Sequence, residues 1–411
     1  MNYKPLSIYK RQNNASSTEV FEEYKKRLNS YATFRTDLEP YLMDKDTLSS
    51  KTFPIFIFGL PDITLATERI KSNSNYIKQI ANSLPPVATK QFFLETLTNE
   101  IKSTNDIEGV HSSKEEISFA IKQTTKRDKV RLGSTVRMYM DIMEKNHPQI
   151  KTLDDIRDLY DHLLEKEISE SDKIDGKFFR KHAVHIESYN QDKVVHYAPT
   201  GEQKVENLMH KWIEFINNSD YPMLVKATIG HYFFENIHPF YDGNGRTGRY
   251  ILSIYLSRKL DIYTGMSISQ AVQSHKTQYY KAFNITGDAN NFSEGTFFVM
   301  EMLDLIENSQ YTIIDSLKSR ADKFKKVLTK INDDFNRKTP ENYVLFLLTQ
   351  SKLFSSQHNG LTDREILDMA KDTKYSVRKI KSAISDLVER KILIQIKGRP
   401  LQHELTDDYI S

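Results

Sequence analysis

Apolar side chains recur at three- and four-residue spacing along most of the chain, which is the pattern of helices that bury one face. The segment 205–216 is the clearest example. Its apolar positions fall on a single face and are Val205, Leu208, Met209, Trp212, Ile213 and Ile216. No internal repeat and no low-complexity tract interrupts this pattern. The sequence therefore predicts a mostly α-helical fold.

A further helix is predicted at about 91–108, after the proline pair at 85–86. Its apolar stripe stops before Gly109, and glycine commonly ends helices. The next helix is expected to start at Ser113, because "SKEE" has the form of a capping box with Glu116.

Two stretches rich in β-branched and aromatic residues, "HAVHIESY" and "KVVHYAP", interrupt the helical pattern. Only the polar "NQD" separates them, and this spacing is typical of two antiparallel strands joined by a short turn. We expect a β-hairpin at about 182–199.

The character of the chain changes after about residue 310. A charged helical connector, 311–339, ends at Pro340, and residues 340–411 hold three short helical patterns and a final pair of strand candidates. This order resembles a winged helix-turn-helix domain. In its third helix the positions expected in the core are Val377, Ile380, Ile384 and Leu387, and those expected outside are Lys374, Arg378, Lys381 and Ser385. The outward face is basic, so DNA is a candidate partner, and a solvated or protein-binding face is the alternative.

Composition narrows the class of protein. The 411 residues allow two or three domains, and 58 basic against 55 acidic residues give a net charge of only +3, so the chain as a whole is no polyelectrolyte for nucleic acid. The absence of cysteine excludes disulfides and thiolate chemistry and fits a reducing cytosol. No apolar run is long enough for a bilayer, so no membrane association and a cytoplasmic location are expected.

The densest chemical signal is "HPFYDGNGRTGR" at 238–249. Its proline and glycines break two helical patterns, which predicts a loop that leads into a helix N-terminus. Free amides and the helix dipole attract phosphate there, and Gly243 and Gly245 allow close backbone approach. Arg246 and Arg249 lie three residues apart and can clamp anionic oxygens. The motif predicts a polyphosphate ligand.

Two further residues of the motif suggest transfer chemistry. Asp242 would repel phosphate unless a divalent cation such as Mg²⁺ lay between them. His238 follows a helical pattern and can accept a proton from an attacking hydroxyl near neutral pH. Each residue alone could be a cap, a turn residue or a solvated charge, but together they favour transfer from a nucleotide. His231 raises a two-histidine metal site, but the spacing lacks H-E-x-x-H and a third ligand, which favours a packed core histidine.

The predicted helix at 91–108 places a carboxylate on its buried face. Ile101, Thr104 and Glu108 continue the stripe that begins at Leu97. Because the helix dipole disfavours an anion at a C-terminus, Glu108 needs a cation partner unless it is simply solvated.

The motif at 238–249 resembles the signature of the Fic family, enzymes that transfer AMP from ATP to protein hydroxyls. The similarity runs from about "SLPPVATK" to "SQYTII", half to two thirds of the chain. It implies a helical catalytic domain at 91–310, preceded by a helical region at 1–90. The hairpin at 182–199 would be the family's flap, which aligns the target segment by strand pairing.

The resemblance implies a role for each position of the motif. His238 would be the general base for a tyrosine, threonine or serine hydroxyl, and Asp242 would bind Mg²⁺ or Mn²⁺ at the α- and β-phosphates of ATP. The remaining implied roles are an anchor for the loop at Phe240, an anion hole at Gly243, Asn244 and Gly245, β- and γ-phosphate contacts at Arg246 and Arg249, and neighbours of adenine at Tyr279 and Tyr280. Relatives of the Doc type, which phosphorylate their targets, carry lysine at the position of Gly245, so this glycine favours nucleotidyl transfer.

A second segment, "TNDIEG", resembles the inhibitory helix of the family, at about 91–109. The resemblance implies that Thr104, Glu108 and Gly109 form a brake in which Glu108 pairs with Arg249 at the place of the γ-phosphate. In some relatives the same glutamate activates water to remove AMP from the modified protein, so de-AMPylation is a further implied activity.

The sequence thus predicts an autoinhibited protein adenylyltransferase that acts on target proteins and on itself, with the C-terminal unit in targeting or homodimer formation. The alternative is a nucleotide-sensing, DNA-binding regulator with little or no turnover. The intact motif favours the enzyme, since a sensor would tolerate loss of the base.

Overall fold

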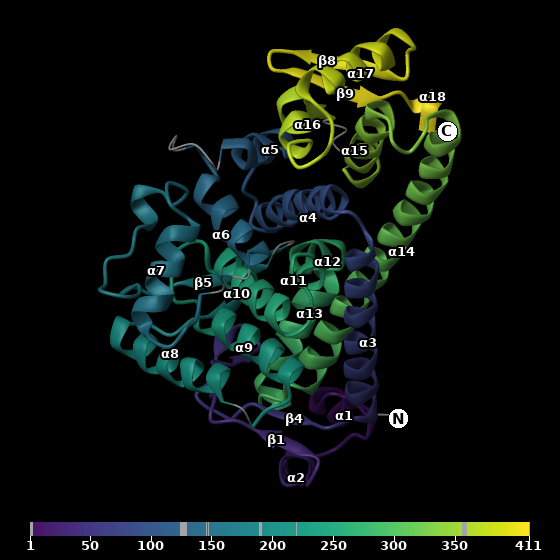
Figure 1. Cartoon of the computed structure of the whole chain (residues 1–411). Coiled ribbons are helices and arrows are strands. Elements are labelled where there is room, and N and C mark those ends of the chain that lie inside the picture. Colours follow the sequence, from purple (N-terminus) through teal and green to yellow (C-terminus); the bar gives the residue numbers. More distant parts are fainter. Residues whose placement is uncertain are drawn as a thin grey trace. The chain divides into compact units, whose positions relative to one another are not determined.

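The computed structural model describes residues 3–123, 130–144, 146, 148–188, 191–218, 220–355 and 360–410. Its contacts divide the chain into two units, the first formed by Met1–Ser74 and Thr98–Tyr311 and the second by Asn75–Leu97 and Thr312–Ser411. Most described residues are helical (Figure 1), which confirms the predicted fold class.

The helices are joined by loops and, in places, by short strands. They are α1 (Leu6–Gln12), α2 (Ser17–Leu28), α3 (Pro61–Ser83), α4 (Pro86–Ile107), α5 (Lys114–Gln123), α6 (Gly133–Met143), α7 (Leu153–Leu163), α8 (Glu202–Asn217), α9 (Met223–Ile237), α10 (Asn244–Lys259), α11 (Ile262–Gly265), α12 (Ile268–Ser274), α13 (Lys276–Gly287), α14 (Thr296–Asp334), α15 (Pro340–Phe354), α16 (Asp363–Met369), α17 (Val377–Glu389) and α18 (Asp407–Ile410). The strands are β1 (Thr33–Arg35), β2 (Met43–Asp44), β3 (Thr47–Leu48), β4 (Phe56–Phe58), β5 (His185–Ser188), β6 (Gln191–Tyr197), β7 (Leu361–Thr362), β8 (Leu393–Gly398) and β9 (Leu401–Leu405).

Helix α9 packs against both α8 and α10 in the first unit (Figure 1). The predicted stripe of α8 faces inward, with Val205, Met209 and Trp212 buried. Helix α9 is buried almost all round, because apolar residues cover every face of "MLVKATIGHYFFENI". The Trp212 indole donates to the carbonyl of Gly230 at 2.7 Å, so α8 is fixed to the middle of α9.

Helix α4 begins at Pro86, five residues before the predicted start, since proline is well suited to the first helical position. Its end at Ile107 agrees with the prediction, and Gly109 follows with a left-handed φ of 72°. The Ser113 hydroxyl accepts a hydrogen bond from the N–H of Glu116 at 3.1 Å, as expected for the start of α5.

Within the first unit, which includes Thr98–Ile107 of α4, a buried carboxylate holds this part of the helix in place. Glu100 is fully buried, and its two oxygens accept the N–H of Ser269 at 3.0 and 2.9 Å, at the start of α12. The Ser253 hydroxyl of α10 donates to the same carboxylate at 3.4 Å. The register of α4 against the helix that follows "DGNG" is therefore set by this side chain.

The predicted hairpin at 182–199 is confirmed as β5 paired antiparallel with β6. Four short strands, which the sequence did not suggest, lie in the N-terminal region, where β1 pairs with β4 and β2 with β3. The β2–β3 hairpin contacts β6, and Asp46 at its turn forms an ion pair with Lys193 of β6 at 2.7 Å. Such short strands escape prediction because too few residues define their alternation.

The second unit contains the predicted C-terminal elements. The connector is helical and continuous with α14. Helices α15, α16 and α17 pack with a three-stranded sheet in the order β7-β9-β8. Its assignment to the winged-helix class stays a prediction.

The third helix of this unit, α17, confirms most of the predicted pattern. Ile380, Ile384 and Leu387 are buried. The four residues predicted to face outward, Lys374, Arg378, Lys381 and Ser385, are exposed. The placement of Val377 in the core was wrong, since its side chain is 58% exposed. Val377 is the first residue of α17 after the Ser376 cap, where the helix projects beyond the core.

Within the described part of the chain, no helix has the length and apolarity that a bilayer crossing requires.

We predict that Glu100→Ala lowers the free energy of unfolding by about 2–3 kcal/mol, because it leaves the buried N–H of Ser269 without an acceptor. Glu100→Gln should cost less, since its amide oxygen still accepts one bond. Urea denaturation followed by circular dichroism measures both. Equal losses in the two variants would contradict an anchoring role for the acceptor oxygens.

Candidate active site

The motif at 238–249 forms the connection between α9 and α10. His238 follows the last residue of α9 and has a left-handed backbone, with φ 50° and ψ 61°, while its N–H donates to Phe234 at 3.0 Å. Few non-glycine residues adopt this conformation, and it persists only where the surroundings enforce it. The turn directs the chain away from α9 and toward the start of α10.

Side chains of the loop hold its shape. Phe240 is fully buried and stacks on Tyr160, with ring centroids 3.7 Å apart. The Asn244 side chain accepts the N–H of Phe240 at 2.9 Å and donates to its carbonyl at 2.8 Å. Phe240 is thus packed into the core, as expected for a residue that anchors the loop. The side-chain amide of Asn244 holds the two ends of the loop together.

Two glycines are required by close approaches. Gly243 has a φ of 80°, and a side chain there would come within 2.2 Å of Leu164. A Cβ at Gly245 would lie 2.2 Å from a carboxylate oxygen of Glu108. A side chain at position 245 would therefore require the Glu108 carboxylate to move from its present place.

A cavity of about 510 Å³ lies over this loop. Of the predicted site residues, those that line it are Glu108, His238, Gly245, Arg249, Tyr279 and Tyr280. Residues of β6, including Val195 and His196, form another part of the wall, and Met43 and Lys45 of the β2–β3 hairpin contribute as well. The volume lies in the range that binds a nucleotide-sized ligand.

Arg249 and Glu108 form an ion pair at one wall of the cavity. An Arg249 Nη lies 2.8 Å from the Glu108 carboxylate, and the same guanidinium donates to the hydroxyl and carbonyl of Thr104 at 3.0 and 3.2 Å. Arg249 is only 2% exposed, and the Glu108 side chain is 24% exposed. Burial opposes ionisation of Glu108, but Arg249 outweighs it and holds the pKa of Glu108 below its usual value. Glu108 therefore has the cation partner that its position requires.

The other arginine of the motif, Arg246, pairs with two carboxylates, those of Glu167 and Asp242. Arg246 is buried between Glu167 at 3.1 Å and Asp242 at 3.0 Å, and Glu167 also accepts the Thr135 hydroxyl at 2.8 Å. Neither Asp242 nor Arg246 lines the cavity. The sequence did not single out Glu167, because it lies 79 residues from its arginine with no motif around it.

His238 has surroundings that keep its imidazole neutral. Burial, together with nearby His196 and Arg180, lowers the pKa of His238 to about 4, although Glu108 acts in the opposite direction. The buried Nδ1 has no hydrogen-bond partner among the described residues. The imidazole is therefore free to accept a proton over the physiological pH range.

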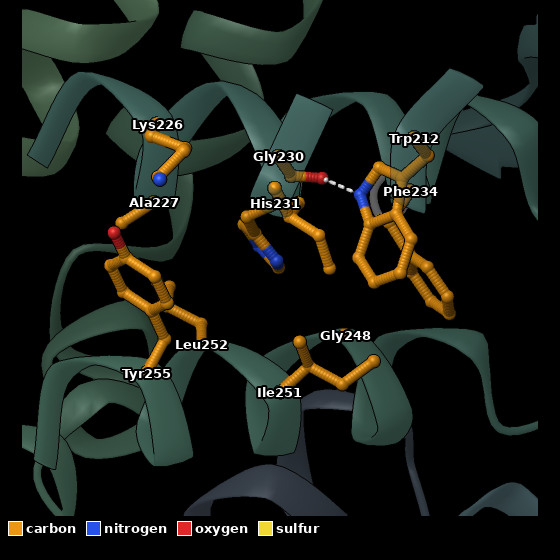
Figure 2. Close-up of a pocket in the computed structure, with 11 residues that line it drawn as sticks. Trp212, Lys226, Ala227, Gly230, His231, Phe234, Gly248, Ile251, Leu252 and Tyr255 are labelled. Atoms are coloured by element: carbon orange, nitrogen blue, oxygen red, sulfur yellow. Dashed lines mark hydrogen bonds between the residues drawn. The ribbon is translucent and has the colours of Figure 1, made fainter. Parts of the chain in front are cut away.

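His231 is a packed core histidine, as its surroundings in α9 show. Its Nε2 lies 2.7 Å from the Tyr279 hydroxyl, and burial lowers the pKa of His231 to about 3. Figure 2 shows His231 beside a second cavity of about 40 Å³ between α9 and α10, closed at one end by Trp212 and Phe234. That cavity is too small for a nucleotide.

A divalent cation would find one protein ligand at this loop. The Asp242 side chain is 41% exposed, and no group of three histidine, cysteine, aspartate or glutamate residues in the described ranges could cage a metal. Mg²⁺ bound to a nucleotide usually takes one or two carboxylates and completes its shell with phosphate oxygens and water. The donor set fits a cation of this kind, delivered with the nucleotide.

Comparisons with known proteins agree with this geometry. The model of the Fic/DOC family matches residues 150–256, which include α7 to α9, the β5–β6 hairpin and most of α10. A crystal structure of a Fic family protein from Desulfovibrio desulfuricans G20 shares the fold, with a TM-score of 0.52 at 18% identity over 85% of this chain and 97% of that one.

Two curated relatives are named "Protein adenylyltransferase Fic". The one from Drosophila mojavensis is 28% identical over 143 residues, 34% of this chain and 25% of that protein. The one from Aedes aegypti is 24% identical over 155 residues, 37% of this chain and 28% of that protein. The chain therefore spans about a quarter of the length of these relatives. Residues 150–256 therefore match a Fic/DOC domain.

We predict that Glu235→Gln stabilises the protein increasingly as pH rises from 5 to 8. Burial raises the pKa of Glu235, on α9, to about 8, so the folded state holds a proton that the unfolded chain has lost above about pH 4.5. Stability from this group is therefore complete below pH 4.5 and declines up to pH 8. Glutamine removes that decline, worth about 3 kcal/mol at pH 7.

Urea unfolding at several pH values measures the free energy of unfolding of the wild type and of Glu235→Gln. The buried histidines contribute equally to both proteins, so their effect is absent from the difference. Glu214→Gln, on the exposed face of α8, is the control and should give a difference that does not depend on pH. A pH-independent difference for Glu235→Gln would contradict the prediction.

Proposed function

We propose that this protein is a protein adenylyltransferase, which transfers AMP from ATP to a hydroxyl side chain of a target protein or of itself. The observation that carries the proposal is that His238, Gly245 and Arg249 line one cavity together with strand β6 of the hairpin. The names of the curated relatives support it.

In the proposed reaction, neutral His238 takes the proton of a tyrosine, threonine or serine hydroxyl. The freed oxygen attacks the α-phosphorus of ATP, a new O–P bond forms, and the bond from that phosphorus to the bridging oxygen of the β-phosphate breaks. The products are the AMP ester of the protein and pyrophosphate. A base with a pKa below neutrality, such as His238, is unprotonated at the start of each cycle.

The phosphates would lie at the N-terminus of α10. Amides of the first turn, at Asn244 and Gly245, have no acceptor within the helix and can bind anionic oxygens. The amide of Gly243 donates to Asp242 at 2.6 Å and would have to exchange this acceptor for an oxygen of the ligand. Arg249, and Arg246 once it is shared with the ligand, would bind the β- and γ-phosphates. Mg²⁺ or Mn²⁺ on Asp242 would neutralise charge on the departing pyrophosphate.

The β5–β6 hairpin would receive the target protein. Strand pairing uses backbone groups and needs little sequence in the target, so the hydroxyl could be brought to His238 from many proteins. Tyr279 and Tyr280, which line the cavity, would lie near adenine.

We further propose that Glu108 inhibits the enzyme by occupying Arg249. A buried guanidinium binds either this carboxylate or a phosphate of ATP. With Glu108 in place, bound ATP would lack one contact to its γ-phosphate. Thr104 and Gly109 support the brake, because Thr104 binds the same arginine and Gly109 ends α4 at the required turn.

We expect Glu108→Gly to raise the initial rate of AMP incorporation from α-labelled ATP. A shielded, charge-assisted pair is worth about 2–3 kcal/mol, which corresponds to roughly 30- to 150-fold in rate. Adding His238→Ala should abolish incorporation. Autoradiography measures the rate, and intact mass gives the number of adenylyl groups on the protein.

Asp106→Gly is the matched control, since Asp106 lies in the same turn but pairs with Lys102 and not with Arg249. An unchanged rate in Glu108→Gly, or an equal rise in Asp106→Gly, would rule out the brake. We also propose that ionised Glu108 activates water for de-AMPylation, so the modified protein should lose AMP to the wild type but not to Glu108→Gly.

A second candidate function is that of a nucleotide-sensing regulator that binds DNA. The observation in its favour is the exposed basic face of α17, with Arg378, Lys379 and Lys381 beside Lys374. A face of this kind can follow the phosphates of a duplex.

If α17 binds DNA, Arg378→Glu with Lys381→Glu should weaken binding to duplex DNA and reduce the salt slope by about 0.9 for each phosphate that is no longer neutralised. Filter binding over a range of salt concentrations measures this. Lys371→Glu, an exposed lysine outside α17, is the control. Wild-type affinity that does not change with salt or DNA length would exclude this function.

A further inference from the structure

Arg180 is a buried arginine whose guanidinium binds only backbone carbonyls. It lies in the segment before β5, is fully buried, and has no carboxylate within ion-pair distance in the described part of the chain. Its Nε donates to His238 at 2.8 Å, one Nη to Ile237 at 3.2 Å, and the other to His182 at 2.8 Å. Its backbone N–H donates to Pro239 at 3.2 Å.

Three of these four carbonyls are at the end of α9 and the start of the motif. The last carbonyls of a helix receive no hydrogen bond from an N–H of the same helix, and they lie at the negative end of the helix dipole. A cation is therefore stabilised there. The fourth carbonyl, that of His182, is at the base of the β5–β6 hairpin. One guanidinium therefore connects the hairpin to the backbone of His238.

Neighbouring contacts make the connection rigid. The His182 N–H donates to the Tyr241 hydroxyl at 3.0 Å, and that hydroxyl donates to Asp175 at 2.8 Å. The carboxylate of Glu202 accepts the N–H of Phe178, two residues before Arg180, at 2.7 Å. The segment is thus fixed at both of its ends.

A simple stabilising role accounts poorly for this arrangement. A buried guanidinium without a carboxylate costs free energy, and burial lowers the pKa of Arg180 to about 10. The arrangement is explained if these contacts enforce a backbone conformation that the loop would not adopt alone. His238 has such a conformation, since its φ of 50° is unusual for a residue with a side chain.

We propose that Arg180 is a positioning residue that holds the backbone of His238 in its left-handed turn and ties it to the hairpin that receives the target. The inference rests on the proposed function, in which His238 is the base and the hairpin binds the target. Arg180 itself does not line the cavity and touches neither ATP nor the target hydroxyl.

Charged and titratable groups reach His238 from several elements. They are Arg180, His196 of β6 and Glu108 after α4, and Glu235 contributes through its backbone. His196 adds a second link from the hairpin to α9, because its Nε2 lies 2.7 Å from the carbonyl of Asn236. Loss of the positive charge at Arg180 should therefore make His238 easier to protonate.

The experiment compares Arg180→Met and Arg180→Lys in the Glu108→Gly protein. Methionine should lower the maximal rate of AMP incorporation about 100-fold through misplacement of the base. The ATP concentration for half-maximal rate should stay unchanged, because the cavity wall is intact. Lysine should restore part of the rate, since it keeps the charge but lacks the fork that reaches three carbonyls.

NMR of ¹³C-histidine-labelled protein provides a readout that does not depend on activity. The His238 signal, assigned by its loss in His238→Gln, should shift and titrate at higher pH in Arg180→Met than in the parent. Arg27→Met is the matched control, because Arg27 is also buried in the first unit and binds a carbonyl, that of Lys4, but lies outside the cavity. It should reduce stability and leave the maximal rate and the His238 signal unchanged.

An equal loss of rate in Arg180→Met and Arg27→Met, or an unchanged His238 signal in Arg180→Met, would overturn the proposal. Absence of AMP incorporation in the Glu108→Gly parent would instead overturn the proposed function. The NMR comparison would then still decide whether Arg180 positions His238.

Discussion

The buried guanidinium of Arg249 is the group on which the arrangement of the site depends. A charge that is 98% removed from solvent must have an anionic or strongly polar partner, and here Glu108 and Thr104 at the end of α4 provide it. Glu100 fixes α4 against α10 and α12, so the whole helix cannot follow Glu108 away from the arginine. The proposed competition for Arg249 would therefore be confined to the end of α4, and helix ends are the parts of a helix that open most easily.

The loop proposed to carry the chemistry is held in shape by side chains that are assigned no step of the reaction. Phe240 packs on Tyr160, Asn244 closes the backbone on itself, and Arg180 binds the carbonyls around His238. Backbone groups of a turn and short side chains are already held in place, so they lose little conformational entropy when a ligand binds. Such a preorganised site favours group transfer. The left-handed φ of Gly243 is a further backbone constraint on this loop.

Sequence patterns were most informative where the signal was local. The helical stripes, the end of α4 near Glu108 and the hairpin all correspond to observed elements, because periodicity and turn residues act over a few positions. The prediction that Val377 lies in the core was wrong, because periodicity identifies the buried face of a helix but not the position along the helix at which the core ends. The short N-terminal strands, Glu167, Arg180 and His196 were not recognised as parts of the site, and no motif marks them.

The sequence by itself determined which candidate reactive groups lie together, because the glycines, the arginine pair, the aspartate and the histidine occupy twelve consecutive positions, and their spacing predicts a phosphate-binding turn. Resemblance to a family suggested which distant carboxylate would join them. Only the tertiary structure decided that Glu108 and Arg249, 141 residues apart, are in contact. It also decided that Arg246 pairs with both Glu167 and Asp242, and that burial keeps His238 neutral. These outcomes depend on packing between distant segments, and burial sets the charge state of each group there.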